Sequence, residues 1–241
     1  MLKYLSGLRH FAGDIFHHAQ DQITFWNVKR QGGTYTDFYE IKMDRKALKD
    51  GIEVSGRPRD KVFHLDYLRK QGLVPSMHFL DFGCGAAASG VSIIEFLDKG
   101  RYTGADISQE CLRHANSLIA SNQLSDKAPV FLHLPGGSTA PLRNKQYDVI
   151  WAQSVLTHLP PAEIQTFFDL VKKHLAPGGR AFATYTHNNS SIEQKRTKNY
   201  EYNEGILQTM ASNAGLRAKR LDCWIHPRSS LDYMLEIKDQ H

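Results

Sequence analysis

The sequence predicts an α/β protein with a seven-stranded, mostly parallel sheet, helices on both faces of the sheet and a helical cap at the N-terminus. An apolar run from Met77 to Phe82 ends in a glycine-rich turn and precedes a helical pattern over residues 86–98. Short apolar runs and amphipathic segments then alternate to the end of the chain, which is typical of a parallel sheet. The preceding residues lack this alternation. We therefore expect a cap over residues 1–74 and a cofactor-binding domain over residues 75–241.

The predicted cap combines helical spacing with many aromatic side chains. Apolar residues between Leu2 and Phe16 have the spacing of an amphipathic helix, which would serve as a cap or as a dimer contact. A break at residues 31–33 precedes a loop and a short helix, and another helix is expected over about residues 59–71. The aromatic side chains of the cap could line a pocket or pack against the sheet. They are Phe11, Phe16, Phe25, Trp26, Tyr35, Phe38 and Tyr39.

The elements after the glycine-rich turn can be placed from their patterns. Strands are expected over residues 101–105, 129–134, 147–152 and 180–185, and helices over about residues 108–122, 160–176 and 204–214. Residues 190–202 are polar and charged, which predicts a loop. Residues 216–223 and 230–237 are expected to close the sheet as an antiparallel pair.

Composition and charge narrow the classes of function. The formal net charge of +5 is spread along the chain without interleaved aromatics, so nucleic acid is not an expected partner. No apolar run approaches the ~20 residues that span a bilayer, and no signal-peptide core is evident. Cys84, Cys111 and Cys223 are too widely spaced for a disulfide framework or a zinc site. We expect a cytoplasmic protein without a metal ion.

The glycine-rich turn has the features of a nucleotide cradle. Gly83 and Gly85, with Cys84 between them, allow a ligand to approach the backbone closely, and a helix follows. About twenty residues further on, Asp106 ends a strand and is placed to accept the hydroxyls of a ribose. Gly83 and Gly85, followed by Ala88, also fit the dinucleotide-binding fingerprint. An NAD-dependent oxidoreductase is therefore one alternative.

Asp81 distinguishes two possible cofactors. Its carboxylate would repel a pyrophosphate but suits a ligand that carries an amino group and a sulfonium. With this acid, the turn resembles the first motif of the class I S-adenosylmethionine-dependent methyltransferases. Residues 147–159, the helix from Ala162 and the segment 175–185 resemble later motifs of that family. The resemblance extends from about Pro75 to the C-terminus. It implies a Rossmann-like fold, S-adenosylmethionine as cofactor and methyl transfer.

The resemblance also implies a set of cofactor contacts. The residues concerned are Asp81, Gly83, Cys84, Gly85, Asp106, Ile107 and Gln153. Residues 135–139 lack the acidic residue that often binds the adenine amino group in this family, so we expect backbone carbonyls around residues 134–136 to bind it instead. Ala87 stands where a third glycine is usual, and Arg57 and Arg59 are candidates for the cofactor carboxylate.

Two histidines are candidates for a general base. His158 follows the strand 147–152, and His187 follows the strand 180–185. His158 can equally be a structural residue, and His187 a solvated one. No Asn-Pro-Pro-Tyr-like motif follows the strand 147–152, which disfavours nucleic-acid bases and protein glutamine as acceptors. We expect a small-molecule or glycan hydroxyl as the acceptor. A non-catalytic cofactor-binding module remains another alternative.

Overall fold

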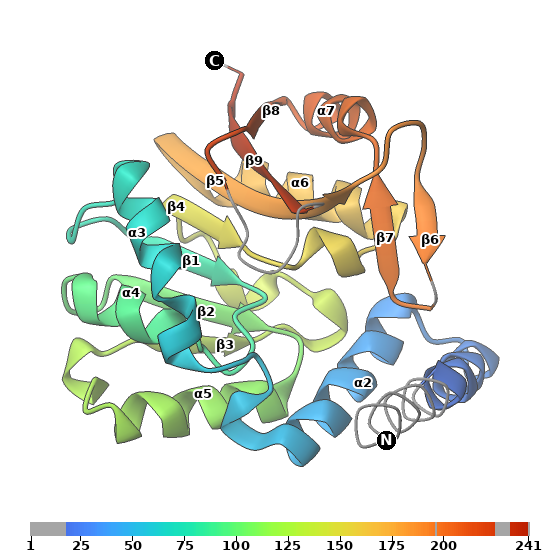
Figure 1. Cartoon of the computed structure of the whole chain (residues 1–241), viewed down its shortest axis with the longest axis horizontal. Coiled ribbons are helices and arrows are strands. Elements are labelled where there is room, and N and C mark those ends of the chain that lie inside the picture. The colour runs from blue at the N-terminus through green and yellow to red at the C-terminus, as the bar shows by residue number, and fades with distance from the viewer. Residues whose placement is uncertain (1–17, 196, 225–231, 241) are drawn as a thin grey trace, which may run out of the picture.

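Within the residues that the structure describes, 18–195, 197–224 and 232–240, nine strands form one central sheet in this computed structural model (Figure 1). They are β1 (Phe79–Phe82), β2 (Tyr102–Asp106), β3 (Val130–His133), β4 (Tyr147–Ala152), β5 (Leu175–His187), β6 (Glu193–Lys195), β7 (Asn199–Tyr202), β8 (Leu216–Leu221) and β9 (Asp232–Asp239). Their order is β3-β2-β1-β4-β5-β7-β6, while β9 pairs with β5 and with β8. The pairings from β3 to β5 are parallel, and β8 and β9 form the predicted antiparallel pair.

Helices cover both faces of the sheet, as the sequence predicts. Because side chains alternate along a strand, Phe79 and Leu80 of β1 belong to different apolar cores. Helices α3 (Val62–Lys70) and α4 (Gly90–Phe96) pack in the core that contains Phe79. Helices α6 (Pro161–His174) and α7 (Glu204–Asn213) pack in the core that contains Leu80. The Rossmann-like α/β fold is confirmed.

The cap packs into the core on the α6 face. Residues 18–30 form a helix, and α2 (Tyr35–Asp50) is a full helix where only a short one was expected. Thr34 begins α2 with a capping box in which Thr34 and Asp37 bond each other's backbone N–H. The ring of the buried Phe38 lies 5.4 Å from that of Phe25, and the ring of Tyr35 lies 6.0 Å from that of Tyr200. The predicted boundary at residue 74 stays a prediction, and the predicted helix at the start of the chain lies outside the described residues.

The expected loop over residues 190–202 is instead a hairpin that extends the sheet. β6 and β7 pair antiparallel, and β7 pairs parallel with the end of β5. Tyr200 and Tyr202 are buried, while Asn199 and Glu201, which alternate with them along the strand, are less so. This alternation is the strand signal, but four residues within a polar segment are too few for it to stand out. The hairpin adds two strands to the seven predicted.

The helix expected over residues 86–98 begins later, at Gly90. Ala87 has φ of +57°, in the left-handed region, so the chain turns once more before α4. Among the described residues, no helix has the length and apolar content that a membrane span requires.

Candidate active site

A cavity of about 580 Å³ lies at the carboxyl ends of β1, β2 and β4, between the sheet and α2. Ligands of open α/β sheets bind at this edge. Residues of the strand ends that line the cavity include Asp81, Gly83, Cys84, Gly85, Asp106, Ile107 and Gln153. The structure thus brings into one cavity all the residues predicted to contact the cofactor. Their individual contacts with a cofactor stay predictions.

The glycines of the turn have left-handed backbone conformations, and residues of other segments lie close to them. Gly83 and Gly85 have φ of +73° and +55°, and a Cβ at Gly85 would lie 2.0 Å from Oγ of Ser55. The same hydroxyl accepts the N–H of Ala86 at 3.0 Å. A Cβ at Gly83 would lie 2.5 Å from Val155, in the segment after β4. Glycine is therefore required here both for its backbone conformation and for the close approach of Ser55, a cap residue.

Asp106 is fixed by backbone donors at the end of β2. Its carboxylate accepts the N–H of Gly85 at 2.7 Å and the N–H of Ser108 at 2.8 Å. Burial raises the pKa of this carboxyl, and the two N–H donors partly oppose the rise. A carboxylate has about four lone-pair sites, so two remain for other donors. Asp106 can therefore hold the glycine turn and accept ligand hydroxyls at the same time.

Asp81 is a buried carboxyl that accepts a hydrogen bond. Tyr102 donates its hydroxyl to Oδ2 of Asp81 at 2.7 Å. Burial raises the pKa of Asp81 to about 7, against the opposing effects of Tyr102 and of the nearby Lys61. Lys61 is a cap residue that also lines the cavity. The cavity wall thus carries a carboxyl group, Asp81, and a nearby ammonium group, Lys61.

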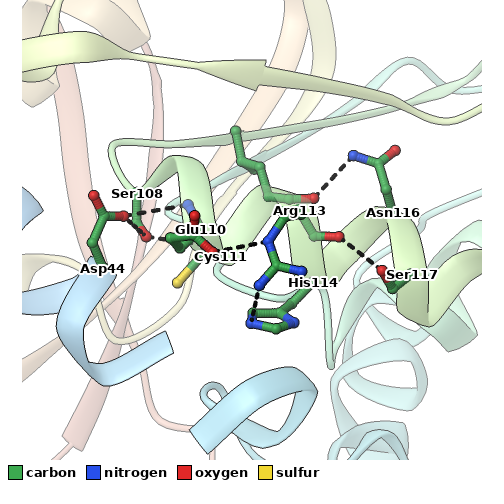
Figure 2. Close-up of polar contacts among 9 residues, drawn as sticks. Asp44, Ser108, Glu110, Cys111, Arg113, His114, Asn116 and Ser117 are labelled. Atoms are coloured by element: carbon green, nitrogen blue, oxygen red, sulfur yellow. Dashed lines mark hydrogen bonds and ion pairs between the residues drawn. The ribbon is translucent and has the colours of Figure 1, made fainter. Parts of the chain in front are cut away.

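Helix α2 is anchored to the residues that follow β2, directly beside Asp106. Figure 2 shows Asp44 of α2 at the start of α5 (Gln109–Ser121). Asp44 accepts the hydroxyl of Ser108 at 2.6 Å and the N–H of Glu110 at 3.3 Å, while Ser108 Oγ accepts the N–H of Cys111 at 3.0 Å. The side chain of Asp44 therefore holds this part of the cap over the end of β2.

His158 lines the cavity and is held in one tautomer. It ends the short helix η6 (Leu156–His158), and its Nδ1 lies 3.0 Å from the carbonyl of Lys198 in the β6–β7 turn. Because a carbonyl only accepts, Nδ1 carries the hydrogen and Nε2 the lone pair. Tyr39 of α2 stacks on the imidazole, with ring centroids 5.4 Å apart. Burial lowers the pKa of His158 to about 4, so the ring is neutral at pH 7.

His187, the second predicted base, lies elsewhere. It ends β5, its Nε2 lies 3.0 Å from the amide oxygen of Asn189, and its ring packs edge-on against Tyr233 at 5.1 Å. Among the described residues that line the cavity, His187 is absent. The structure brings His158 to the predicted cofactor residues but does not bring His187 there.

The turn after β3 differs from the sequence expectation in detail. Leu134, Gly137 and Thr139 line the cavity, and the carbonyl of Leu134 already accepts the N–H of Gly137 at 3.0 Å. The N–H of Gly136 donates to Glu40 of α2 at 3.1 Å. A carbonyl oxygen has a second lone pair, so Leu134 can still accept a donor from an adenine. Thr139 adds a hydroxyl that the sequence reasoning did not single out.

A match to a known family covers the centre of the sheet. Residues 80–181, from β1 into β5, match the family described as "Methyltransferase domain". Together with the fold and the position of Asp81 before the glycine turn, this match favours the methyltransferases over the NAD-dependent oxidoreductases considered from the sequence.

The chain has the fold of the class I S-adenosylmethionine-dependent methyltransferases, and its residues 80–181 match a methyltransferase domain.

Individual relatives are distant. Sterol 24-C-methyltransferase ERG6B of Gibberella zeae is 27% identical over 167 residues. The match covers 64% of this chain and 41% of that protein, so the chain spans less than half of this relative's length. Magnesium protoporphyrin IX methyltransferase of Synechocystis PCC 6803, solved with bound SAM, has a TM-score of 0.63 at 14% identity and covers 85% of this chain and 96% of its own. The glycopeptide N-methyltransferase MtfA has a TM-score of 0.58 at 12% identity, covering 75% and 96%. At these identities the solved structures establish the fold.

The cap side of the methyltransferase cavity lies outside the matched residues. Cap residues that line it include Tyr35, Tyr39, Lys42, Lys46, Ser55 and Lys61. Of the cap aromatics, Tyr35 and Tyr39 line the cavity, whereas Phe25 and Phe38 pack in the core and Trp26 is exposed. Arg57 and Arg59 do not line it in the described residues, and Arg57 pairs with Glu53 at 3.1 Å. Sequence reasoning missed Lys42, Lys61 and Lys198 because nothing in a lysine's local pattern marks it as facing a cavity.

Proposed function

We propose that this methyltransferase transfers the methyl group of S-adenosylmethionine to a hydroxyl of a small molecule, such as a sugar or another biosynthetic intermediate. The observation that carries the proposal is that the cavity joins Asp81 and Asp106, at the ends of β1 and β2, to the neutral imidazole of His158 beneath α2. The proposed cofactor residues and the candidate base thus line one cavity.

In the proposed complex, each end of the cofactor has a partner. Asp106 accepts the ribose hydroxyls through its free lone pairs, and Ile107 packs against the adenine. Asp81 pairs with the amino group of the methionine portion, and Lys61 pairs with its carboxylate. Gly83 and Gly85 allow close approach of the cofactor to the backbone. S-adenosylmethionine then supplies the methyl group and its own leaving group.

The proposed reaction depends more on the position of the acceptor atom than on the strength of an acid or base. Methyl transfer from a sulfonium is an in-line displacement, so the protein has to align an acceptor atom with the methyl group. A hydroxyl must also lose its proton as the bond forms. His158 has its Nδ1–H bonded to Lys198 and so offers the lone pair of Nε2 to that proton. With a pKa of about 4 it is a weak base, which suits removal of the proton in step with transfer.

The cap supplies the acceptor side in this proposal. Tyr35 and Tyr39 line the cavity from α2, and Lys198 lines it from the β6–β7 turn. The relatives are named for a sterol carbon, a porphyrin and a glycopeptide nitrogen, so they share no acceptor. A glycan acceptor, a homodimer and a cytoplasmic location stay predictions from the sequence.

The experiment is to incubate the protein with S-adenosylmethionine and a panel of hydroxylated metabolites, and to measure S-adenosylhomocysteine by mass spectrometry. We expect acceptor-dependent product, and we expect each methylated product to carry the added methyl on oxygen. Product that carries the methyl only on nitrogen or carbon would contradict the hydroxyl assignment. Cofactor turnover that no acceptor stimulates would contradict methyl transfer to a small molecule.

A further inference from the structure

Two lysines from different elements line the cavity beside His158. Lys42 comes from α2, and Lys198 comes from the β6–β7 turn. The Nζ atom of Lys42 lies 5.3 Å from the centroid of the Tyr39 ring, and that ring stacks on His158. His158 in turn donates to the backbone carbonyl of Lys198. Both ammonium groups are close enough to lower the pKa of His158, so the two lysines and the candidate base form one cluster.

The positive charge of this cluster is only partly balanced. Asp21, a buried carboxylate of the helix 18–30, has Oδ2 3.9 Å from Nζ of Lys198. Burial and the neighbouring Lys198 lower the pKa of Lys42 to about 8, and Asp21 opposes this. Within the described residues, Asp21 is thus the carboxylate that acts on both ammonium groups.

The other charged groups of the cap and α6 that line this part of the cavity do not supply the balance. Lys46 is already paired with Asp50 at 3.1 Å, and its Nζ donates to the carbonyl of Val54. Among ion pairs within the described residues, none joins Lys42 or Lys198 to Glu163, the carboxylate of α6 that lines the cavity.

We propose that Lys42 and Lys198 form a subsite for an anionic group of the methyl acceptor, either a carboxylate or a phosphate ester. This inference rests on the proposed function, because it assigns the same cavity to an acceptor. An anion between the two ammonium groups would offset their mutual repulsion and the burial of Lys42. Lysine acts as a point charge with rotatable donors, so the subsite accepts either anion.

The position of the subsite also constrains the acceptor. The backbone of Lys198 holds the His158 imidazole while its side chain binds the anion. The acceptor's anionic group and its reacting hydroxyl would therefore bind in the same part of the cavity. Binding of the anion would orient the acceptor, so that its hydroxyl is aligned with both the base and the methyl group. An uncharged acceptor leaves the two ammonium groups uncompensated and is disfavoured.

The test compares pairs of probes that differ only in charge. The full chain, saturated with S-adenosylhomocysteine, is titrated in a calorimeter with para-hydroxybenzoate and its amide, and with glycerol phosphate and glycerol. We expect the anionic member of at least one pair to bind about tenfold or more tightly than its neutral partner, as for charge-assisted hydrogen bonds. Lys42→Met and Lys198→Met are each expected to remove most of this preference. Lys46→Met is the matched control and is expected to keep it, because Lys46 is already paired.

Two results would overturn the subsite. One is the absence of any anion preference in both pairs, including the case in which no probe binds. The other is a preference that survives in both lysine variants or is lost equally in Lys46→Met. S-adenosylhomocysteine affinity, measured in the same samples, separates this failure from that of the proposed function. Normal affinity with no anion preference removes the subsite alone, whereas a parent protein that does not bind S-adenosylhomocysteine removes both.

Discussion

The buried carboxyl of Asp81 makes cofactor binding dependent on pH. Burial raises its pKa to about 7, well above the ordinary value for aspartate. The protonated form is therefore favoured in the free folded protein, so this group stabilises the fold at pH below about 4 and that contribution is lost as pH rises through about 7. The ammonium group of the cofactor requires the ionised form. Binding must therefore release a proton when the pH is below about 7.

The size of the effect follows from the pKa. At pH 5 a carboxyl with a pKa of about 7 is ionised in about one molecule in a hundred. The dissociation constant for S-adenosylhomocysteine is therefore expected to rise about tenfold for each pH unit below 7, and about 100-fold at pH 5 relative to pH 8. Asp81→Asn removes this titration and is expected to bind weakly at every pH.

The assay is calorimetric titration of S-adenosylhomocysteine between pH 5 and 8, in two buffers of different ionisation enthalpy. The parent protein is expected to show the affinity gradient and to release protons to the buffer at pH 6. A flat affinity profile in the parent, or the same profile in Asp81→Asn as in the parent, would refute the pairing of Asp81 with the cofactor amino group.

Three further predictions concern the same cavity. Asp106→Ala is expected to weaken S-adenosylhomocysteine binding by about 1.5–3 kcal/mol, the value of charge-assisted hydrogen bonds; unchanged affinity in the folded variant, measured by calorimetry, would remove the ribose assignment. His158→Ala should slow product formation about 10²-fold or more if the imidazole is the base. At saturating S-adenosylmethionine the rate of the parent protein should stay unchanged down to about pH 5, because the pKa of His158 is about 4. His187→Ala should keep the parent rate, and the reverse pattern in initial-rate assays would exchange their roles. Gly85→Ala should lower the free energy of unfolding, measured by urea denaturation, more than Gly100→Ala does. Both glycines have positive φ, but an added Cβ would have open space at Gly100 and would meet Ser55 at Gly85. Equal losses would contradict the close contact between the cap and the glycine turn.

The central part of the fold could be predicted because its signals are local. The apolar run of β1, the glycines after it and the alternation of strands with amphipathic helices all repeat within short windows. The β6–β7 hairpin could not be predicted, because its signal is the burial of Tyr200 and Tyr202 in a polar segment. That burial depends on the pairing of β7 with β5, a contact that exists only in the folded chain.

Some residues of the candidate site could likewise be predicted from the sequence, and others could not. Asp81, Asp106 and the glycines could be identified because the turn between strand and helix fixes where they lie. The cap residues could not, because α2 reaches the cavity through contacts distant in sequence, such as that of Asp44 with Ser108. His158 and His187 looked alike in the sequence, each following a strand. Only the folded chain shows that the β6–β7 turn holds His158 at the cavity, while the end of β5 carries His187 away from it.

The most direct test of the account is a calorimetric comparison of two ligands at pH 8. S-adenosylhomocysteine is expected to bind the full chain with one-to-one stoichiometry, and NAD is expected not to bind measurably, because the Asp81 carboxylate would face its pyrophosphate. Binding of NAD in preference to S-adenosylhomocysteine would contradict the assignment of the cavity to a methyl donor.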